Sequence, residues 1–187
     1  MAYTGLDRFI ARCRFRAALP HIKPQSSICD VGCGLDGAFL TFAGDRIARG
    51  VGIDDQAETG RKTTWPVIRA DIYKGLPFAD GEFDHVVMLA VLEHLTQPEI
   101  VLKEVNRILR PGGSLVMTWP QSLVDPILGI LHHAGMVSHE MESDEHQKRI
   151  PLPALLGMLS ALGYDGFIHK KFEFGLNNLL VARKAGH

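Results

Sequence analysis

Cysteine is scarce in this chain of 187 residues, and neither sign of charge dominates it. The three cysteines form no CxxC pair, so a disulfide framework is excluded and a reducing compartment is favoured. Twenty basic and 21 acidic residues give a net charge of −1, which offers no general attraction for DNA or RNA. No apolar run approaches the ~18 residues of a membrane span, and no signal peptide is visible. We therefore expect a cytoplasmic protein with no nucleic-acid partner and no membrane span.

Segments typical of strands alternate with segments typical of helices along most of the chain. This alternation predicts an α/β, Rossmann-like, doubly wound fold with a mostly parallel seven-stranded sheet. The tight Phe174-Gly175 link predicts that the two last strands are antiparallel to each other, which gives an antiparallel C-terminal strand. The expected strands cover residues 27–31, 49–54, 67–72, 85–92, 114–118, 166–174 and 176–183.

Two helices carry clear signals. The helix expected at 6–19 has arginines 8, 12 and 16 on one face, which is either a solvated surface or a site for an acidic or phosphorylated partner. In the helix that precedes Pro111, Thr96 and Glu99 have the spacing of a capping box. A third helix is expected near 152–162, and Trp119-Pro120 is expected to end the fifth strand.

A glycine-rich turn follows the first strand directly. Gly32, Gly34 and Gly37 fit the pattern GxGxxG, and Asp54 lies about 20 residues later at the end of the next strand. Such a turn lets backbone approach a nucleotide where a Cβ atom would collide. Cys33 is expected to be a small spacer rather than a nucleophile. By itself the pattern also fits an NAD(P)-binding oxidoreductase, but the chain has no room for a separate substrate domain.

From this turn onward the sequence resembles the class I S-adenosylmethionine-dependent methyltransferases, in the branch typified by small-molecule and quinone methyltransferases. The resemblance covers roughly residues 26–120 and rests on five ordered motifs. They are Ile28-Cys-Asp-Val-Gly-Cys-Gly-Leu-Asp-Gly, Gly52-Ile-Asp54, Ala70-Asp-Ile72 with Leu76-Pro-Phe78 and Phe83-Asp84, Val91-Leu-Glu-His-Leu95, and Leu109-Arg-Pro-Gly-Gly113.

The resemblance implies S-adenosyl-L-methionine as cofactor, S-adenosyl-L-homocysteine as product, and a role for each matched residue. Asp54 would accept hydrogen bonds from both ribose hydroxyls, and Asp71 from the adenine amino group. Asp30 would fix the loop or meet the methionine ammonium; for Asp30 and Asp71 a simple turn or capping role is the alternative. The cofactor residues implied in this way are Asp30, Gly32, Cys33, Gly34, Ile53, Asp54, Asp71, Ile72, Leu89 and Ala90, with Ile53 and Ile72 against the adenine ring and the backbone of Leu89 and Ala90 at the methionine side.

Two features depart from the family pattern. The third glycine is displaced: Asp36 stands at its usual place and Gly37 follows one residue later. Only residues 55–65 separate the second and third strands, and they are poor in helix formers, so the usual second helix is expected to be vestigial. Both departures leave a non-catalytic cofactor-binding relative as a further alternative.

Methyl transfer needs alignment and, for a hydroxyl or amine acceptor, removal of a proton. His94 follows the fourth strand at the expected mouth of the site and is the leading candidate base, with a structural capping role as the alternative. Trp119 either lines the acceptor pocket or seals the core.

A histidine-rich segment at 132–146 holds four histidines and four carboxylates. It is a solvated surface or lid, an acceptor-recognition element in which His139 is the leading histidine, or a metal site. No HExxH or similar spacing is present, so no metal is expected. The acceptor is expected to be a small molecule of unknown identity, and the oligomeric state is open. The expected organisation is a single methyltransferase domain, 1–187, made of an N-terminal helix (1–25), a cofactor-binding core (26–120), an acceptor-side insertion (121–151), and a C-terminal helix and hairpin (152–187).

Overall fold

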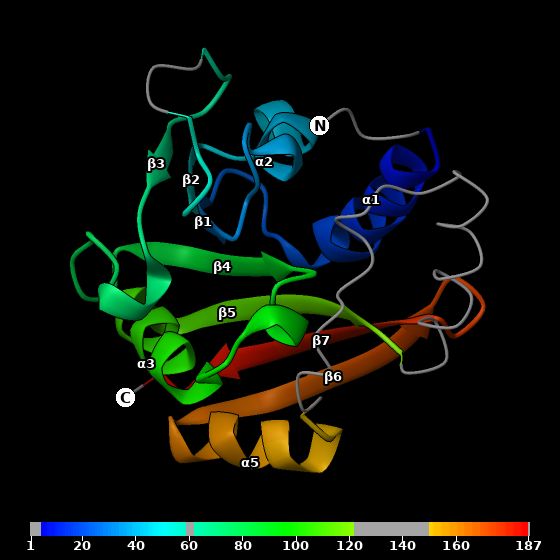
Figure 1. Cartoon of the computed structure of the whole chain (residues 1–187). Helices are drawn as coiled ribbons and strands as arrows, with labels where there is room; N and C mark the ends of the chain where they lie inside the picture. Colours follow the sequence, from blue (N-terminus) through cyan, green and yellow to red (C-terminus); the bar gives the residue numbers. More distant parts are fainter. Residues whose placement is uncertain (1–4, 59–61, 122–149, 187) are drawn as a thin grey trace.

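The computed structural model describes residues 5–58, 62–121 and 150–186 (Figure 1). One seven-stranded sheet runs through the molecule in the order β3-β2-β1-β4-β5-β7-β6. The strands are β1 (Ser27–Val31), β2 (Arg49–Asp54), β3 (Val67–Arg69), β4 (Phe83–Leu89), β5 (Leu109–Pro120), β6 (Tyr164–Phe172) and β7 (Asn177–Lys184).

The pairing confirms the predicted topology. Strands β1 to β5 pair in parallel with one another, and β7 is antiparallel to both β5 and β6. The strand order reverses at β1, because β2 and β4 pair with its two sides. In open α/β sheets ligands bind outside the carboxyl ends of the strands at such a reversal. The fold therefore places the candidate site beyond the ends of β1, β2 and β4.

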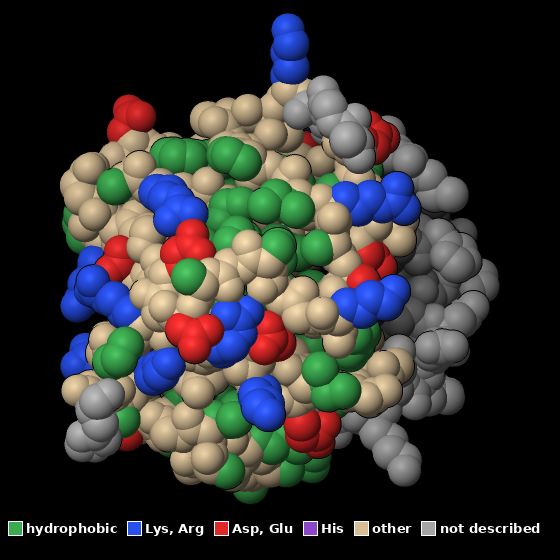
Figure 2. All heavy atoms as spheres, turned by 90° about the vertical axis from the view of Figure 1, so that its left-hand side faces the viewer, with side chains coloured by type: hydrophobic (Ala, Val, Ile, Leu, Met, Phe, Trp, Pro, Cys, Tyr) green, Lys and Arg blue, Asp and Glu red, His purple; other side chains and the backbone are tan. Residues whose placement is uncertain are grey.

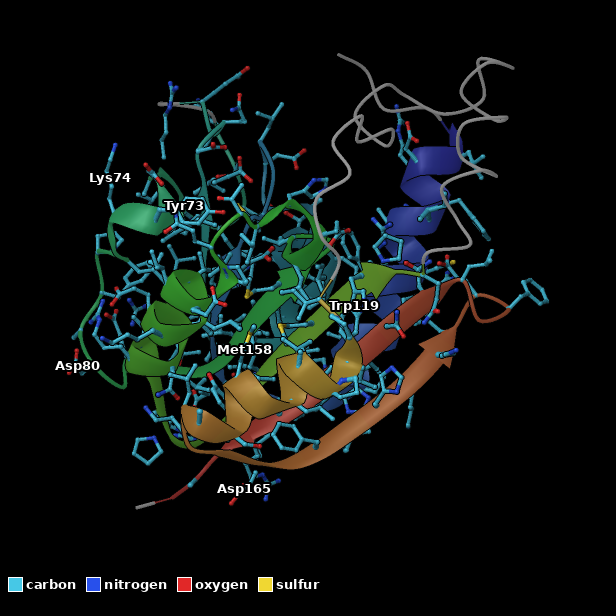
Figure 3. All side chains as sticks on the ribbon, turned by 60° about the horizontal axis from the view of Figure 1, so that its bottom comes forward. Tyr73, Lys74, Asp80, Trp119, Met158 and Asp165 are labelled. Carbon is cyan, nitrogen blue, oxygen red and sulfur yellow. The ribbon has the colours of Figure 1, made fainter. Side chains whose placement is uncertain are left out.

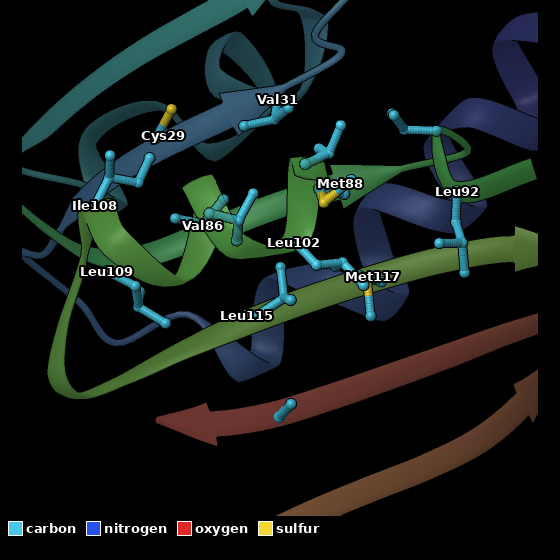
Figure 4. Close-up of a cluster of buried hydrophobic side chains, with 14 of the residues drawn as sticks. Cys29, Val31, Val86, Met88, Leu92, Leu102, Ile108, Leu109, Leu115 and Met117 are labelled. Carbon is cyan, nitrogen blue, oxygen red and sulfur yellow. The ribbon is translucent and has the colours of Figure 1, made fainter. Parts of the chain in front are cut away.

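Helices cover both faces of the sheet (Figure 1). Helices α1 (Gly5–Ala18) and α2 (Ala38–Ala43) pack on one face, and α3 (Pro98–Ile108) and α5 (Leu152–Ala161) pack on the other. Figure 4 shows the core on the α3 side, where Val86, Met88, Leu115 and Met117 of the sheet meet Leu102. Apolar side chains buried on both faces explain why β4 reads as an almost continuous apolar run.

Two sequence predictions about element ends are wrong. The capping box does not form, since Gln97 is the residue before α3 and makes no side-chain cap; the Thr96 hydroxyl lies 3.2 Å from the Tyr73 hydroxyl instead. Trp119-Pro120 does not break β5, because both residues pair with β7, Trp119 opposite Asn178 and Pro120 opposite Asn177. Proline is tolerated there because it is the last residue of the strand.

Short 3-10 helices complete the connections: η1 (Leu19–His21), η2 (Gly44–Arg46), η3 (Ile72–Lys74) and η4 (Leu92–His94). Between β2 and β3, residues 55–58 and 62–66 contain no helix, as the short spacing predicted. The third strand is also shorter than expected and ends at Arg69. Figure 2 shows basic and acidic side chains interspersed on the side of the molecule that carries β3 and α3. None of the helices described is long and apolar enough for a membrane crossing.

Candidate functional site

The glycine turn after β1 is held against the end of β2. The backbone N–H groups of Gly32 and Cys33 both donate to the Ile53 carbonyl, at 2.8 and 3.1 Å. Gly34 has a φ of +71°, and no atom lies within 4 Å of the position that a Cβ would take there. Any side chain at this position would therefore be strained and would project into that space. The turn leaves room for a ligand to approach its backbone.

Cys33 packs inward and is not exposed as a nucleophile. A Cβ built on Gly52 would lie 2.5 Å from the Cys33 Sγ atom, so the thiol occupies the space that Gly52 leaves free. Burial and the neighbouring negative charges of Asp30 and Asp54 raise the pKa of the Cys33 thiol. A thiol that stays protonated is a poor nucleophile, which agrees with the predicted spacer role.

Asp54 joins the turn to the loop after β2. One carboxylate oxygen accepts from the Gly34 N–H at 2.8 Å, and the other accepts from the Gln56 N–H at 2.9 Å. Each carboxylate oxygen has two lone pairs, so both can still accept a hydroxyl donor. The side chain keeps some exposed surface. Its position is compatible with the predicted contact to a ribose.

Asp30 is a buried carboxylate with unused hydrogen-bonding capacity. It is 2% exposed at the end of β1, and the part of the chain that the structure describes offers its side chain no hydrogen bond. Burial, and after it the charge of Asp54, raises the pKa of Asp30 to about 8. Buried polar groups are normally paired, and an unpaired one at a strand end calls for an explanation. A cationic ligand group beside the glycine turn would supply the missing partner.

Beyond β2 and β3 the surface is hollowed into a cavity of about 520 Å³. It is lined by Asp55, Gln56, Arg69, Ala70 and Asp71, so it lies next to Asp54. Arg69, Gln56 and Asp55 were not predicted as site residues, since no motif marks them. The lining of the cavity is mainly polar, and the cavity continues the surface beside Asp54.

The residues predicted on the adenine side lie in different environments. Asp71 caps η3: it accepts from the Tyr73 N–H at 3.0 Å and forms an ion pair with Lys74 at 3.2 Å. The hydrogen bond from Tyr73 and the Lys74 ammonium lower the pKa of Asp71. Ile72 is partly exposed beside it, but Ile53 is 0% exposed within the core. Because β2 turns that side chain into the core, the structure exposes no surface of Ile53 to an adenine ring, and the expected contact stays a prediction.

The end of β4 closes over the glycine turn. Val91 lies where a Cβ on Gly32 would point, so no other residue fits at position 32. Ala90 has a φ of +59°, a left-handed conformation that costs a residue with a Cβ on the order of 1–2 kcal/mol, and its N–H donates to the Thr118 carbonyl at 2.9 Å. Strained backbone of this kind concentrates at functional sites. Leu89 and Ala90, both predicted at the methionine side, lie at the same edge as Asp30.

His94 lies on η4, in the loop that begins with Val91. It keeps exposed surface, and the surrounding protein together with the charge of Arg14 lowers its pKa, so the imidazole is neutral at pH 7. Arg14 of α1 is itself largely desolvated and is attracted by Glu93 and Glu173. Sequence reasoning missed this electrostatic interaction between α1 and η4, because Arg14 lies outside the arginine stripe at 8, 12 and 16.

Trp119 stands at the carboxyl end of β5 (Figure 3). It stacks on His169 of β6, with ring centroids 6.2 Å apart and planes 22° from parallel. Asn178 accepts from Gln121 at 2.6 Å and lies 3.0 Å from the His169 ring. His169 was not predicted, since the sequence of β6 does not show that this histidine lies against Trp119 of β5. His139 and the histidine-rich segment lie outside the described residues.

Comparison with known proteins agrees with this geometry. Residues 29–117 match the family model described as a methyltransferase domain. The chain is 26% identical over 175 residues to a probable methyltransferase, ltbC, of Aspergillus luteorubrus, covering 79% of this chain and 60% of that protein. It is 32% identical over 111 residues to the 2-methyl-6-phytyl-1,4-hydroquinone methyltransferase of Synechocystis, covering 55% of this chain and 35% of that protein.

Residues 29–117, just under half of the chain, carry the sequence of a methyltransferase domain, and the chain resembles the class I S-adenosylmethionine-dependent methyltransferases. Its fold matches that of a solved SAM-dependent methyltransferase from Archaeoglobus fulgidus, with a TM-score of 0.73 over 95% of this chain and 94% of the other at 16% identity. The family match sets aside the NAD(P) oxidoreductase alternative. The chain spans less than two thirds of the length of the two curated relatives described above.

S-adenosylmethionine is the cofactor of this family, and the residues at the carboxyl edge fit it. The molecule carries a cationic ammonium and a sulfonium, for which the buried Asp30 carboxylate is a suitable counter-charge. Its ribose hydroxyls would suit the free lone pairs of Asp54, and the cavity lined by residues 55–56 and 69–71 lies next to that carboxylate. Gly34, whose Cβ direction is open, follows Asp30 in the chain and donates its N–H to Asp54.

Proposed function

We propose that this protein methylates a small-molecule acceptor with S-adenosylmethionine. The observation that carries the proposal is the buried, unpaired Asp30 beside an open glycine turn, because this combination is adapted to a cationic ligand rather than to stability. The relative that acts on a hydroquinone supports a small molecule as acceptor. When bound, the cofactor supplies an activated methyl group with a good leaving group already in place.

We assign the cofactor contacts residue by residue. Asp30 holds the methionine ammonium, Asp54 accepts from the ribose hydroxyls, and the Gly32 to Gly34 backbone lies against the methionine portion. Asp71 and Ile72 stand at the adenine side of the cavity. Asp71 already caps η3, so it would bind adenine through the lone pairs that Tyr73 leaves free.

His94 is our candidate for the base. A neutral imidazole at the end of the β4 loop is able to take a proton from a hydroxyl or amine acceptor. His139 remains a second candidate. We further propose that residues 26–120 form the cofactor core, and that residues 121–151 and the N-terminal helix recognise the acceptor. Trp119 stands at the junction of these two parts.

A thermal-shift panel tests the proposal. S-adenosylhomocysteine at 100 times its dissociation constant should stabilise the protein by about 2.7 kcal/mol, which is several degrees for a chain of this size. NADH at the same concentration should cause no shift. A shift with NADH alone would refute the assignment.

An acceptor screen that detects transferred methyl groups then tests turnover. Methylated product from any acceptor supports the enzyme, and His94→Ala should lower kcat for a hydroxyl or amine acceptor by about 100-fold if His94 is the base. Cofactor binding without product across a broad screen would favour a non-catalytic relative.

A further inference from the structure

A second cavity lies at the opposite edge of the sheet, where the parallel strands begin, and polar side chains line part of it. It measures about 520 Å³, and Lys23, His85, Ser114 and Arg183 are among the residues that line it. His85 is the third residue of β4 and pairs with Ser114 of β5 just after a register shift near the start of the pairing. Both residues therefore lie toward the edge opposite the cofactor edge. The methyltransferase reaction gives no role to a cavity at this end.

The polar residues form a row across four strands. Ser114 pairs with His85 on β4 and with Arg183 on β7, and Arg183 pairs in turn with Asp165 on β6. His85 is 3% exposed and Ser114 is 9% exposed, in strands that are otherwise apolar. A buried polar pair in such a position is informative, because hydrophobic residues there would cost less.

The hydrogen bonds fix what the row offers to a ligand. The Lys23 backbone N–H donates to His85 Nε2 at 3.1 Å, so Nε2 carries no proton. His85 Nδ1 lies 2.6 Å from the Ser114 hydroxyl and must therefore donate to it. Burial lowers the pKa of His85 to about 4, which keeps the ring neutral despite the nearby Asp84 carboxylate. The hydroxyl proton of Ser114 is then left to donate elsewhere, and the structure shows no acceptor for it within the described residues.

Cationic side chains flank this free donor. Lys23 and Arg183 line the cavity, and neither forms an ion pair with any residue that the structure describes. His21 also lines it; burial and the charge of Lys170 lower the pKa of that histidine. Asp165 is the one carboxylate in the lining and lies at the start of the edge strand β6 (Figure 3). Donors and positive charge thus outnumber acceptors around the Ser114 hydroxyl.

We infer that this cavity is a second ligand site, which binds a small oxyanion such as a phosphate group between the Ser114 hydroxyl, Arg183 and Lys23. Charge-assisted hydrogen bonds from a guanidinium and an ammonium suit phosphate oxygens. The His85 ring has a positioning role, because its Nδ1–H fixes the direction in which the serine hydroxyl donates. Asp165 limits the affinity through its negative charge. The site is separate from the cofactor edge and does not depend on the proposed function.

Calorimetry of the full chain in phosphate-free buffer tests the inference. Inorganic phosphate and glycerol phosphate are titrated separately, so that a free anion and a phosphomonoester are distinguished. Arg183→Gln and Ser114→Ala should each weaken binding of the better probe by about tenfold, the loss of one hydrogen bond to a charged group. Arg16→Gln, which removes an exposed arginine of α1, is the matched control and should bind as the wild type does.

Asp165→Asn provides a test of opposite sign. It removes an exposed carboxylate with little risk to folding and should tighten phosphate binding a few-fold. Unchanged titration of S-adenosylhomocysteine in every variant would show that the fold and the cofactor edge are intact. No heat with either phosphate probe, or binding that neither Arg183→Gln nor Ser114→Ala weakens, would overturn the inference.

Discussion

The carboxylates of Asp30 and Asp84 lie at opposite edges of the sheet, both near β1, and they differ in their hydrogen-bond and ion-pair partners. At the amino edge Asp84 accepts from the Ser27 N–H and hydroxyl, both at 2.7 Å, and forms an ion pair with Arg110. Burial opposes ionisation of Asp84, but these hydrogen bonds and the Arg110 charge lower its pKa overall. At the carboxyl edge Asp30 is more buried and has no such partners among the described residues, and its pKa rises to about 8.

The difference suggests that Asp84 serves the stability of the fold, whereas Asp30 is available to bind a ligand. Asp84 is saturated by its own chain and links the starts of β1, β4 and β5. Asp30 is left with its hydrogen-bonding capacity free, at a cost that folding alone would not require. If the proposed function holds, an unpaired buried carboxylate indicates the cofactor edge more specifically than the glycine pattern, which also fits other nucleotides.

The largest expected effect concerns the pH dependence of stability. The pKa of Asp30 is 3.8 in the unfolded chain and about 8 in the folded one, so the folded state holds this proton more tightly. Its stabilising contribution is full below about pH 4 and is lost as pH rises towards 8, on the order of 3 kcal/mol or more. Asp30→Asn should abolish that loss in denaturant titrations between pH 4 and 8.

Asp45→Asn is the matched control for Asp30→Asn, because Asp45 is exposed at the amino edge. It should leave the wild-type pH dependence unchanged. A slope that survives in Asp30→Asn would mean that Asp30 is not the source.

Next in size is the effect of Asp54→Ala on cofactor affinity. Loss of hydrogen bonds from both ribose hydroxyls to a charged group should weaken S-adenosylhomocysteine binding by about 100-fold in calorimetry. Asp84→Ala is the counterpart at the other edge and should bind the same ligand within about twofold, since it lies a strand length away. Equal losses in the two variants would erase the distinction between the edges.

Asp84→Ala should instead reduce the free energy of unfolding by about 2 kcal/mol, because the partly buried Ser27 N–H and hydroxyl lose their acceptor. Urea unfolding monitored by circular dichroism measures this change. A loss below about 0.5 kcal/mol would show that the amino-edge network adds little beyond an exposed ion pair.

The smallest effect concerns strained backbone at the two edges. Ala90 at the carboxyl edge and Gln25 at the amino edge have φ values of +59° and +56°. Glycine relieves this strain at both positions, so Ala90→Gly and Gln25→Gly should each stabilise the fold by about 1 kcal/mol or less in thermal melts. Only Ala90→Gly should also change cofactor affinity. A change of cofactor affinity in Gln25→Gly but not in Ala90→Gly would contradict the assignment of the carboxyl edge as the cofactor site.

Much of the fold was predictable because local pattern and tertiary packing agree. The alternation of strands and helices, the tight Phe174-Gly175 link and the short connection after β2 each led to a feature that the structure confirms. The capping box failed because the Tyr73 hydroxyl competes for Thr96, a contact 23 residues away that local spacing does not reveal. Trp119-Pro120 stayed in β5 because β7 provides an antiparallel partner.

The positions of site residues at the carboxyl ends of strands were predictable from the sequence. Which way their side chains point was less predictable. Asp30, Asp54 and Leu89 each stand at the carboxyl end of a strand, and the alternating pattern of the sequence is enough to place such ends at one edge. The inward turn of Ile53, the stack of Trp119 on His169 and the left-handed Ala90 depend on register and backbone conformation. His85 reads as part of an apolar strand, and its partner Ser114 is 29 residues away.

The central claim is that the carboxyl edge binds the adenosyl cofactor, and a crystal structure of the protein soaked with S-adenosylhomocysteine tests it most directly. We predict the ribose within hydrogen-bond distance of Asp54, the amino-acid portion against Gly34 and Asp30, and the base in the cavity beside Asp71. Electron density for the nucleoside at any other place on the molecule would contradict the account.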